Sequence, residues 1–263
     1  MVNALLPYGL FLAIFTVLGL SVGSFLNVCG DRLPTGRSII SPPSACDACQ
    51  KRLGFRDLVP LFSYIWLRGR CRYCRAPIPW RLPAVEAAMG IVFPLLYWYY
   101  GLSLELGFSL VYTCLLTLIL LIDIEHQLIP DKVVYPGLVL ALAFSPFQPT
   151  LGAATGLRVI SAVSGGAAGL VVMLLFFLLA RGGMGLGDVK MAALVGLIAG
   201  FPRVFLALFL AVIAGGLVAA ALLGLGLKKR RQPIPFGPFL STGTMAVVVW
   251  GNDIIGWYQQ FIA

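Results

Sequence analysis

Long apolar runs divide this chain, and they restrict what it can fold into more than any single residue does. Hydrophobic residues make up 60% of its 263 positions, and charged residues make up only 11%. A helix needs about 20 apolar residues to cross the hydrocarbon core of a bilayer. We therefore predict an all-α polytopic membrane protein with about eight transmembrane helices. The predicted spans cover residues 5–28, 83–101, 104–122, 133–148, 157–180, 187–201, 203–227 and 236–258.

The positive charge of the chain is concentrated on one side of this predicted topology. Ten of the nineteen Lys and Arg residues lie between Arg32 and Arg81, and loops this basic mark the cytoplasmic side of a membrane. With eight spans, seventeen of the nineteen fall on that side, which leaves only Arg158 and Arg203 outside. The other basic segments on that side are the 123–132 loop, the 181–190 turn and the Lys228-Lys229-Arg230-Arg231 cluster. The net charge of +9 therefore indicates orientation in a lipid bilayer rather than nucleic-acid binding, with both termini outside.

Two pairs of cysteines lie in the only sizeable polar segment, residues 31–82. Cys46 and Cys49 form one CxxC pair, and Cys71 and Cys74 form another after a gap of 21 residues. This spacing is typical of a zinc ribbon, in which each pair sits on a tight turn called a knuckle and four thiolates hold one Zn²⁺. A reducing cytosol keeps such thiols free, and the metal would supply folding energy that so small a segment lacks. A pair of redox dithiols is the alternative.

Each knuckle departs from the usual pattern at one position. A glycine or another small residue usually follows the second cysteine, whereas Gln50 and Arg75 stand there in this chain. The two remaining cysteines, Cys29 and Cys114, lie in or next to predicted spans. We expect them to be ordinary apolar residues of those spans.

Two aspartates lie where predicted spans meet the cytoplasmic face. Asp123 closes the third span, and Asp188 opens the sixth within the glycine-rich stretch 181–190. An ionisable residue at the edge of a hydrocarbon layer is costly, so it usually has a partner or a function. Two adjacent carboxyl groups share one proton near neutral pH, and such a pair can activate a water while it protonates a peptide carbonyl. We therefore predict an aspartate protease, with Asp188 the more ionised member because a helix N-terminus lies behind it.

Other roles compete with this interpretation. Asp188 could simply cap the N-terminus of its helix. A divalent ion held by Asp123, Glu125 and Asp188 is a further alternative, although we expect Glu125 and His126 to face water. A zinc protease or a Ser–His protease is disfavoured, because the chain has one histidine and neither an HExxH nor a G-x-S-x-G motif.

Four residues are candidates to support the catalytic turn. Gly185 and Gly187 would let backbone approach backbone, or let an extended substrate lie against the turn. Asp131 follows Asp123 by eight residues, and Lys190 follows Asp188 by two. An interfacial positive charge at Lys190 and a helix cap at Asp131 would explain both without any role in catalysis.

Five motifs occur in this chain in a specific order. They are Gly23-Ser24-Phe25-Leu26-Asn27-Val28 followed by Arg32-Leu33-Pro34, the paired CxxC segment with Arg68-Gly69-Arg70-Cys71, Asp123-Ile-Glu-His-Gln-Leu-Ile-Pro-Asp131, Gly185-Leu-Gly-Asp188-Val-Lys190, and Ile234-Pro-Phe-Gly-Pro238. Together they resemble the type IV prepilin leader peptidases with N-methyltransferase activity, a branch of the GxGD aspartate proteases. A lone GxGD sequence would be weak support, whereas this series runs nearly from end to end of the chain.

The resemblance implies that Asp123 and Asp188 are the protease pair. The substrate would be a prepilin or pseudopilin precursor, cut on the cytoplasmic side after the glycine that ends its short basic leader. Such precursors serve type IV pili and type II secretion. The resemblance therefore also implies a multi-pass protein of the bacterial cytoplasmic (inner) membrane, with the catalytic face and the cysteine segment in the cytoplasm.

The resemblance further implies that the new N-terminal residue is methylated with S-adenosylmethionine. The chain has no G-x-G-x-x-G nucleotide-binding motif, so this second activity is inferred from the resemblance alone. It maps to Gly23, Asn27 and Arg32 in the opening motif, to the cysteine segment and to Glu86 at the start of the second span. Pairing with Arg81 at the end of a helix would explain Glu86 equally well.

We predict two domains and weigh one further class of function. Residues 1–100 would hold the first two spans and the cysteine segment, as the methyltransferase region, and residues 101–263 would form a six-span peptidase domain. A proton-coupled transporter that uses intramembrane carboxylates is the main alternative, but its charges would lie near the middle of spans and its sequence would repeat. Here the acids lie at span ends and no repeat is evident. A scaffold anchored by the cysteine segment would tolerate loss of either aspartate.

Overall fold

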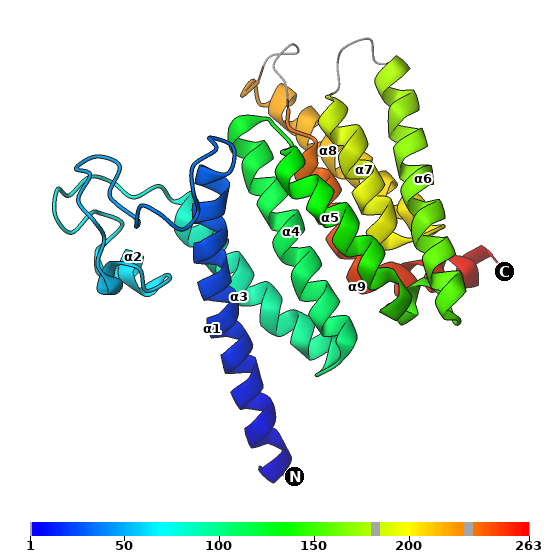
Figure 1. Ribbon diagram of the computed structural model, residues 1–263, viewed down its shortest axis with the longest axis horizontal. Helices are drawn as coiled ribbons and strands as arrows, with labels where there is room; N and C mark the ends of the chain where they lie inside the picture. Colours follow the sequence, from blue (N-terminus) through cyan, green and yellow to red (C-terminus); the bar gives the residue numbers. More distant parts are fainter. Residues whose placement is uncertain (1, 180–184, 229–233, 263) are drawn as a thin grey trace. The chain divides into compact units, whose positions relative to one another are not determined.

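The structure is a computed structural model, and it describes residues 2–179, 185–228 and 234–262 (Figure 1). The helices are α1 (Val2–Arg32), α2 (Phe62–Trp66), α3 (Arg81–Tyr100), α4 (Leu104–His126), α5 (Asp131–Phe144), α6 (Thr155–Leu179), α7 (Leu186–Ala199), α8 (Arg203–Gly224) and α9 (Gly237–Ile262). Short 3₁₀ turns cover Phe55–Asp57, Ser145–Phe147 and Pro149–Leu151. Two sequence predictions fall partly outside the described residues, at 181–184 in the glycine-rich turn and at 229–231 in the basic cluster.

The prediction of an all-α membrane fold is confirmed. Each of the eight predicted spans corresponds to one helix, and the described residues contain no strand beyond two isolated β-bridges. Within the described residues five helices, α1, α3, α4, α6 and α8, are long and apolar enough to cross a membrane. With 14 residues each, α5 and α7 are about 21 Å long, short of the ~30 Å hydrocarbon core. The predicted number of eight spans is therefore not confirmed.

The chain divides into two compact units, residues 1–106 and 107–263. In the first unit α1 packs along α3, and glycines on α1 allow the close approach. A Cβ atom on Gly23 would lie 2.8 Å from the Cα atom of Glu86, so a larger residue would push the helices apart. Further along the same contact the ring of Phe15 stacks on Tyr97, with centroids 4.9 Å apart. These contacts hold together the two helices that the cysteine-containing segment joins.

That joining segment, residues 33–80, is called here the cysteine lobe. An ion pair of 2.8 Å between Arg81 and Asp31 ties the first residue of α3 to the end of α1, so the lobe begins and ends at one place. Inside it, Arg72 donates to the carboxylate of Asp57 at 2.6 Å. Burial alone would raise the pKa of Asp57, but the hydrogen bonds from Arg72 and the Gly54 backbone hold that pKa below its usual value.

In the second unit α7 is the central element. It contacts α5, α6, α8 and α9, and nine of its 14 residues are buried. A helix that is apolar on all sides needs such surroundings, and Figure 1 shows α7 among its neighbours. Gly165 of α6 and Gly196 of α7 lie against each other's backbone, where no side chain would fit. Small residues at this crossing thus bring the helix that carries Asp188 into the middle of the unit.

Candidate active site and metal centre

Asp123 is a buried carboxylate with a fixed hydrogen-bond donor. It lies three residues before the end of α4, and its side chain is 5% exposed. The backbone N–H of Gly237, the first residue of α9, donates to its Oδ2 atom at 2.8 Å. The first N–H groups of a helix have no partner inside the helix, and they favour a negative charge. The start of α9 therefore both satisfies and orients this carboxylate.

A second bond holds α4 and α9 in this arrangement. The hydroxyl of Ser241 in α9 donates to the carbonyl of Leu116 in α4 at 2.9 Å, and both groups are buried. Sequence reasoning quoted Gly237 in the last motif but gave it no role. The structure shows why this residue is a glycine: a Cβ atom there would lie 2.7 Å from the Asp123 carboxylate, so no larger residue fits.

Asp188 is the third residue of α7, and its carboxyl group supports the start of that helix. The N–H of Gly185 donates to its Oδ2 atom at 3.3 Å, so Asp188 supports the helix start from the third position while Gly185, and not Asp188, is the N-cap residue. This contact does not occupy the whole group, since it is the one hydrogen bond that its carboxyl atoms receive within the described residues. The carboxyl groups of Asp188 and Asp123 lie close enough for their charges to repel each other. Support of the helix start and pairing with Asp123 are therefore compatible.

Two contacts bring the start of α7 to the loop after α4. Gly187 lies against Ile129: a Cβ atom added to Gly187 would be 2.9 Å from the Cβ atom of Ile129. Lys190 donates to both carboxylate oxygens of Asp131, at 2.9 and 3.1 Å, and its ammonium lies 5.4 Å from the ring centroid of Tyr135. Lys190 is thus more than an interfacial charge, because it joins α7 to the first turn of α5.

Within the described residues, Asp123, Glu125 and Asp188 do not gather as a set of metal ligands. Glu125 and His126 are exposed, as expected from the sequence. Within the described parts of the chain, the cysteine cluster is the one group of three or more metal-ligating side chains that lie together. A divalent ion held by Asp123, Glu125 and Asp188 therefore gains no support.

The four lobe cysteines converge on one point. Their Sγ atoms all lie within 4.8 Å of one another, and those of Cys46 and Cys74 are 3.8 Å apart. Tetrahedral zinc with Zn–S bonds of about 2.3 Å requires sulfur atoms about 3.8 Å apart, so the set fits this metal. The backbone N–H groups of Cys74 and Tyr73 donate to the Cys71 thiol and lower its pKa to about 7, which favours a thiolate there. The N–H of Ala76 lowers the pKa of Cys74, but burial and the neighbouring thiols raise that pKa to about 11.

The two knuckles repeat the same backbone geometry. In each, the N–H that follows the second cysteine donates back to the carbonyl of the first, from Gln50 to Cys46 at 2.7 Å and from Arg75 to Cys71 at 3.1 Å. Gln50 and Arg75 have φ angles of 55° and 62°, in the left-handed region that glycine usually occupies. The knuckle conformation is therefore present although neither position holds the expected glycine.

Three of the four residues assigned to methyl transfer lie at the α1–α3 crossing. Gly23 packs against Glu86, and the buried side chain of Asn27 donates to the Leu82 carbonyl at 3.0 Å. The Oδ1 atom of Asn27 is buried and has no hydrogen-bond partner in the described structure. Arg32 instead points to the lobe, where it donates to the Ser38 carbonyl.

Glu86 has a backbone partner in the lobe. Its Oε2 atom accepts the N–H of Leu61 at 2.8 Å. Sequence reasoning did not foresee this contact, because a backbone donor in a loop 25 residues away leaves no pattern in the sequence. Arg81, its expected partner, binds Asp31.

Comparison with known proteins finds two family models that together cover most of the chain. Residues 17–100 match the bacterial peptidase A24 N-terminal domain, and residues 110–220 match the type IV leader peptidase family. No solved structure matches the chain.

Curated proteins with the name prepilin leader peptidase/N-methyltransferase are similar over nearly the whole length. The protein of Bacillus subtilis is 32% identical over 94% of this chain and 97% of its own. Those of Stutzerimonas stutzeri and Pseudomonas aeruginosa are 34% and 33% identical, each over 93% of this chain and 92% of its own.

Proposed function

The chain belongs to the type IV leader peptidase family, and we propose that it removes the leader of a prepilin or pseudopilin and then N-methylates the new N-terminus. Relatives that carry both activities in their name match it over more than nine tenths of its length. The observation that carries the proposal is the pair Asp123 and Asp188, whose carboxyl groups interact at the ends of two helices. A transporter finds no support, because the family is one of peptidases.

The catalytic step follows from two carboxyl groups that share one proton. The ionised carboxylate takes a proton from a water, whose oxygen attacks the carbonyl carbon of the scissile bond. The protonated partner donates its proton to the carbonyl oxygen, which gives a neutral tetrahedral intermediate. When the C–N bond breaks, the leaving amine takes up the proton that came from the water. One hydroxyl of the intermediate returns its proton to the second carboxylate, which gives the carboxylic acid product and restores the shared proton. The N–H groups of Gly237 and Gly185 hold the carboxyl groups in place for this exchange.

The test is cleavage of a prepilin precursor in detergent by wild type, Asp123→Asn and Asp188→Asn. Each substitution should lower the cleavage rate by at least about 10²-fold, since general acid–base catalysis contributes 10²–10⁴-fold, with zinc content unchanged. Glu125→Gln removes an exposed carboxyl group two residues from Asp123 and should keep the wild-type rate. Near wild-type cleavage by either aspartate variant would refute the pair, and loss in Glu125→Gln would favour the divalent-ion alternative.

S-adenosylmethionine is the methyl donor in this proposal. The candidate residues are Gly23, Asn27, Arg32 and Glu86, and the unpartnered Oδ1 atom of Asn27 supports a polar ligand near the α1–α3 crossing. Wild type supplied with the donor should release mature pilin whose N-terminus is heavier by one methyl group in mass spectrometry. Complete cleavage without that mass shift would leave a peptidase alone.

The remaining parts of the proposal concern metal and membrane. The convergent thiol groups of Cys46, Cys49, Cys71 and Cys74 support a structural Zn²⁺. The apolar helices support a multi-pass protein of the bacterial inner membrane. The distribution of Lys and Arg supports a cytoplasmic lobe and catalytic face, with both termini outside. Methyl transfer would then belong to residues 1–100 and proteolysis to residues 101–263.

A further inference from the structure

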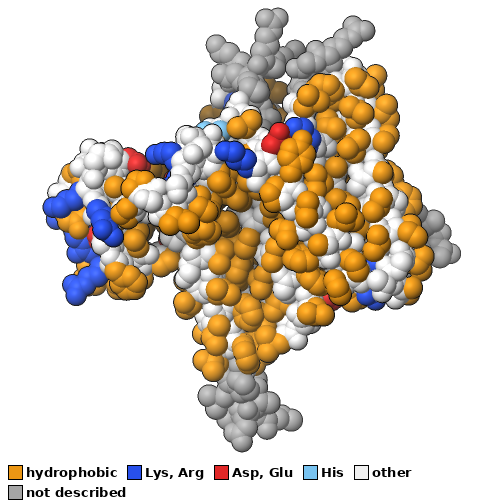
Figure 2. All heavy atoms as spheres, viewed as in Figure 1, with side chains coloured by type: hydrophobic (Ala, Val, Ile, Leu, Met, Phe, Trp, Pro, Cys, Tyr) orange, Lys and Arg blue, Asp and Glu red, His pale blue; other side chains and the backbone are white. Residues whose placement is uncertain are grey.

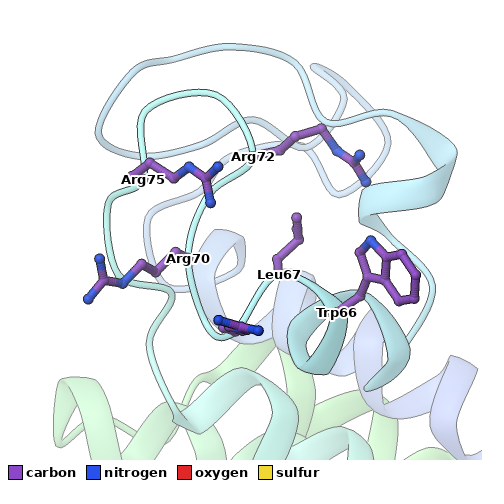
Figure 3. Close-up of a pocket in the computed structure, with 6 residues that line it drawn as sticks. Trp66, Leu67, Arg70, Arg72 and Arg75 are labelled. Carbon is purple, nitrogen blue, oxygen red and sulfur yellow. The ribbon is translucent and has the colours of Figure 1, made fainter.

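A pocket in the cysteine lobe is lined mainly by arginines. Its volume is about 630 Å³, and neither the proposed peptidase chemistry nor the metal uses its side chains. The lining residues are Trp66, Leu67, Arg68, Arg70, Arg72 and Arg75. In Figure 3 the side chain of Leu67 projects into the space below Arg72 and Arg75, Trp66 stands at one side, and Arg70 turns outward.

Most of the arginines at this pocket form no ion pair with an acidic residue of the described chain. Arg72 is paired with Asp57, but Arg68, Arg70 and Arg75 are exposed and form no ion pair within the described residues. Guanidinium groups around one pocket repel one another until an anion joins them. Guanidinium is also the side-chain group best suited to paired hydrogen bonds with phosphate oxygens. The pocket therefore has the chemistry of a phosphate site.

Two of these arginines stand where the backbone favours glycine. The φ angle is 52° at Arg68 and 62° at Arg75, in a region that few residues other than glycine adopt. A glycine would relieve the backbone at both positions without changing the turn. The turns themselves therefore do not require an arginine at either position.

An apolar face adjoins the pocket. Along α2 the side chains of Phe62, Ile65 and Trp66 are 61%, 70% and 71% exposed, and their spacing places them on one side of the helix. The rings of Phe62 and Trp66 lie 5.9 Å apart. Figure 2 shows hydrophobic and basic side chains together on the lobe. Since Trp66 belongs both to this face and to the pocket wall, one ligand with an apolar part and an anionic part can contact both.

The start of α2 lies beside α1 and α3 at a depth that corresponds to the membrane interface. The N–H of Leu61 binds Glu86, which lies more than one turn inside α3 and against Gly23 of α1. Gly23 precedes Arg32 by nine residues, so α2 starts level with a point about 13 Å short of the end of α1. With 31 residues α1 is about 46 Å long, close to the thickness of a bilayer with its headgroups. A helix of this length extends only about 8 Å beyond the ~30 Å hydrocarbon core at each end, so α2 starts level with the upper acyl chains, just below the headgroups.

We propose that α2 and the arginine pocket bind an anionic phospholipid of the surrounding leaflet. Arg68, Arg70 and Arg75 hold the headgroup phosphate, while the apolar face of α2 contacts the glycerol and upper acyl region. The same charges repel a basic leader peptide, and they disfavour S-adenosylmethionine, whose sulfonium, ammonium and carboxylate groups leave it with a net positive charge. Aromatic and basic residues are the usual anchors at this depth. The bound lipid would fix the lobe at the membrane surface.

Native mass spectrometry of the full-length protein in neutral detergent tests this inference. Bound lipid is counted while phosphatidylglycerol or phosphatidylcholine is added. The pocket variant R68Q/R70Q/R75Q is compared with R37Q/R52Q/R56Q, which removes the same charge from exposed lobe positions outside the pocket. Wild type and the control should prefer phosphatidylglycerol, and the pocket variant should bind it at least about tenfold more weakly.

A second variant and a folding readout complete the test. Phe62→Ser with Ile65→Ser leaves every arginine in place and should also weaken binding of phosphatidylglycerol. Zinc content per chain reports whether the lobe is folded, and if the pocket variant loses zinc, the α2 variant decides. Equal binding by pocket and control variants would overturn the inference. So would inorganic phosphate that binds as tightly as the lipid, or a pocket variant that loses S-adenosylmethionine binding and keeps the lipid.

Discussion

Asp123 and Gly237 are 114 residues apart in the chain, and each restricts what the other can be. The carboxylate needs a donor because it is buried, and the helix start provides one only if the backbone comes within 2.8 Å. That approach leaves no room for a side chain on Gly237. The glycine therefore acts as a positioning residue for the carboxyl group that we place in the catalytic pair.

Gly237→Ala should impair cleavage with little loss of folded protein. The added Cβ atom would lie 2.7 Å from the Asp123 carboxylate, so either that group or the start of α9 has to shift. We expect kcat for prepilin cleavage to fall by about 10²-fold, the usual effect of a displacement near 1 Å, and KM to change little. Gly256→Ala, in the same helix with open space around its Cβ position, should keep wild-type kinetics. Equal kinetics for both variants would contradict the positioning role.

At this scale the sequence identifies side chains but not backbone partners. Asp123 and Asp188 attract notice because a carboxylate at the end of an apolar run is costly. The N–H groups of Gly185 and Gly237 carry no such signal, since every residue except proline has one. For the same reason the contact of Leu61 with Glu86 could be found only from the structure.

Among the elements, the two knuckles differ most from the sequence expectation. A glycine was expected at positions 50 and 75, yet the left-handed backbone forms there with Gln50 and Arg75. Convergence of four thiols and repeated backbone hydrogen bonds impose the conformation, so the residue type does not have to. The spacing of the cysteines was the stronger predictor.

Cys71→Ser should release the metal and unfold the lobe. This cysteine is buried, and in the proposed site it supplies one of four thiolates to a zinc ion whose binding would provide most of the folding free energy of so small a segment. Elemental analysis should give about one zinc per wild-type chain and close to none in the variant, with faster proteolysis of residues 33–80. Cys114→Ser, in α4, should keep its zinc. Full zinc content in Cys71→Ser would mean that Cys71 is not a ligand, and wild type without zinc would favour the dithiol alternative.

The eight helices that correspond to predicted spans were predictable in place but not in length, and the short helix α2 was not predicted. The run 5–28 lies inside a helix that extends over Val2–Arg32, because polar residues continue a helix beyond the apolar segment that marks it. The run 133–148 ends in 3₁₀ turns after Phe144, where Pro146 and Pro149 follow. Hydropathy reports the environment of a segment, whereas capping and proline decide where its helix stops.

For the whole molecule, the units and the predicted domains divide the chain at nearly the same place. The two compact units meet between residues 106 and 107, whereas the motifs suggested a boundary after residue 100. The six residues between these boundaries hold the loop after α3 and the first turn of α4. Assignment of methyl transfer to the first domain and proteolysis to the second remains a proposal.

Whether α5, α7 and α9 cross the membrane decides the topology of the whole molecule. Five crossing helices, an odd number, would leave the termini on opposite sides, whereas eight place both outside. The positive-inside distribution favours eight, and short helices such as α5 and α7 can span where the bilayer thins around the protein. Alkaline phosphatase, which is active only outside, should therefore be active when fused after Gly152, Gly200 or Ala263. It should be inactive after Gln127 or Lys228. Five crossing helices predict instead inactive enzyme at Gly152 and Ala263 with activity kept at Gly200, and that result would place Asp123 and Asp188 at opposite faces.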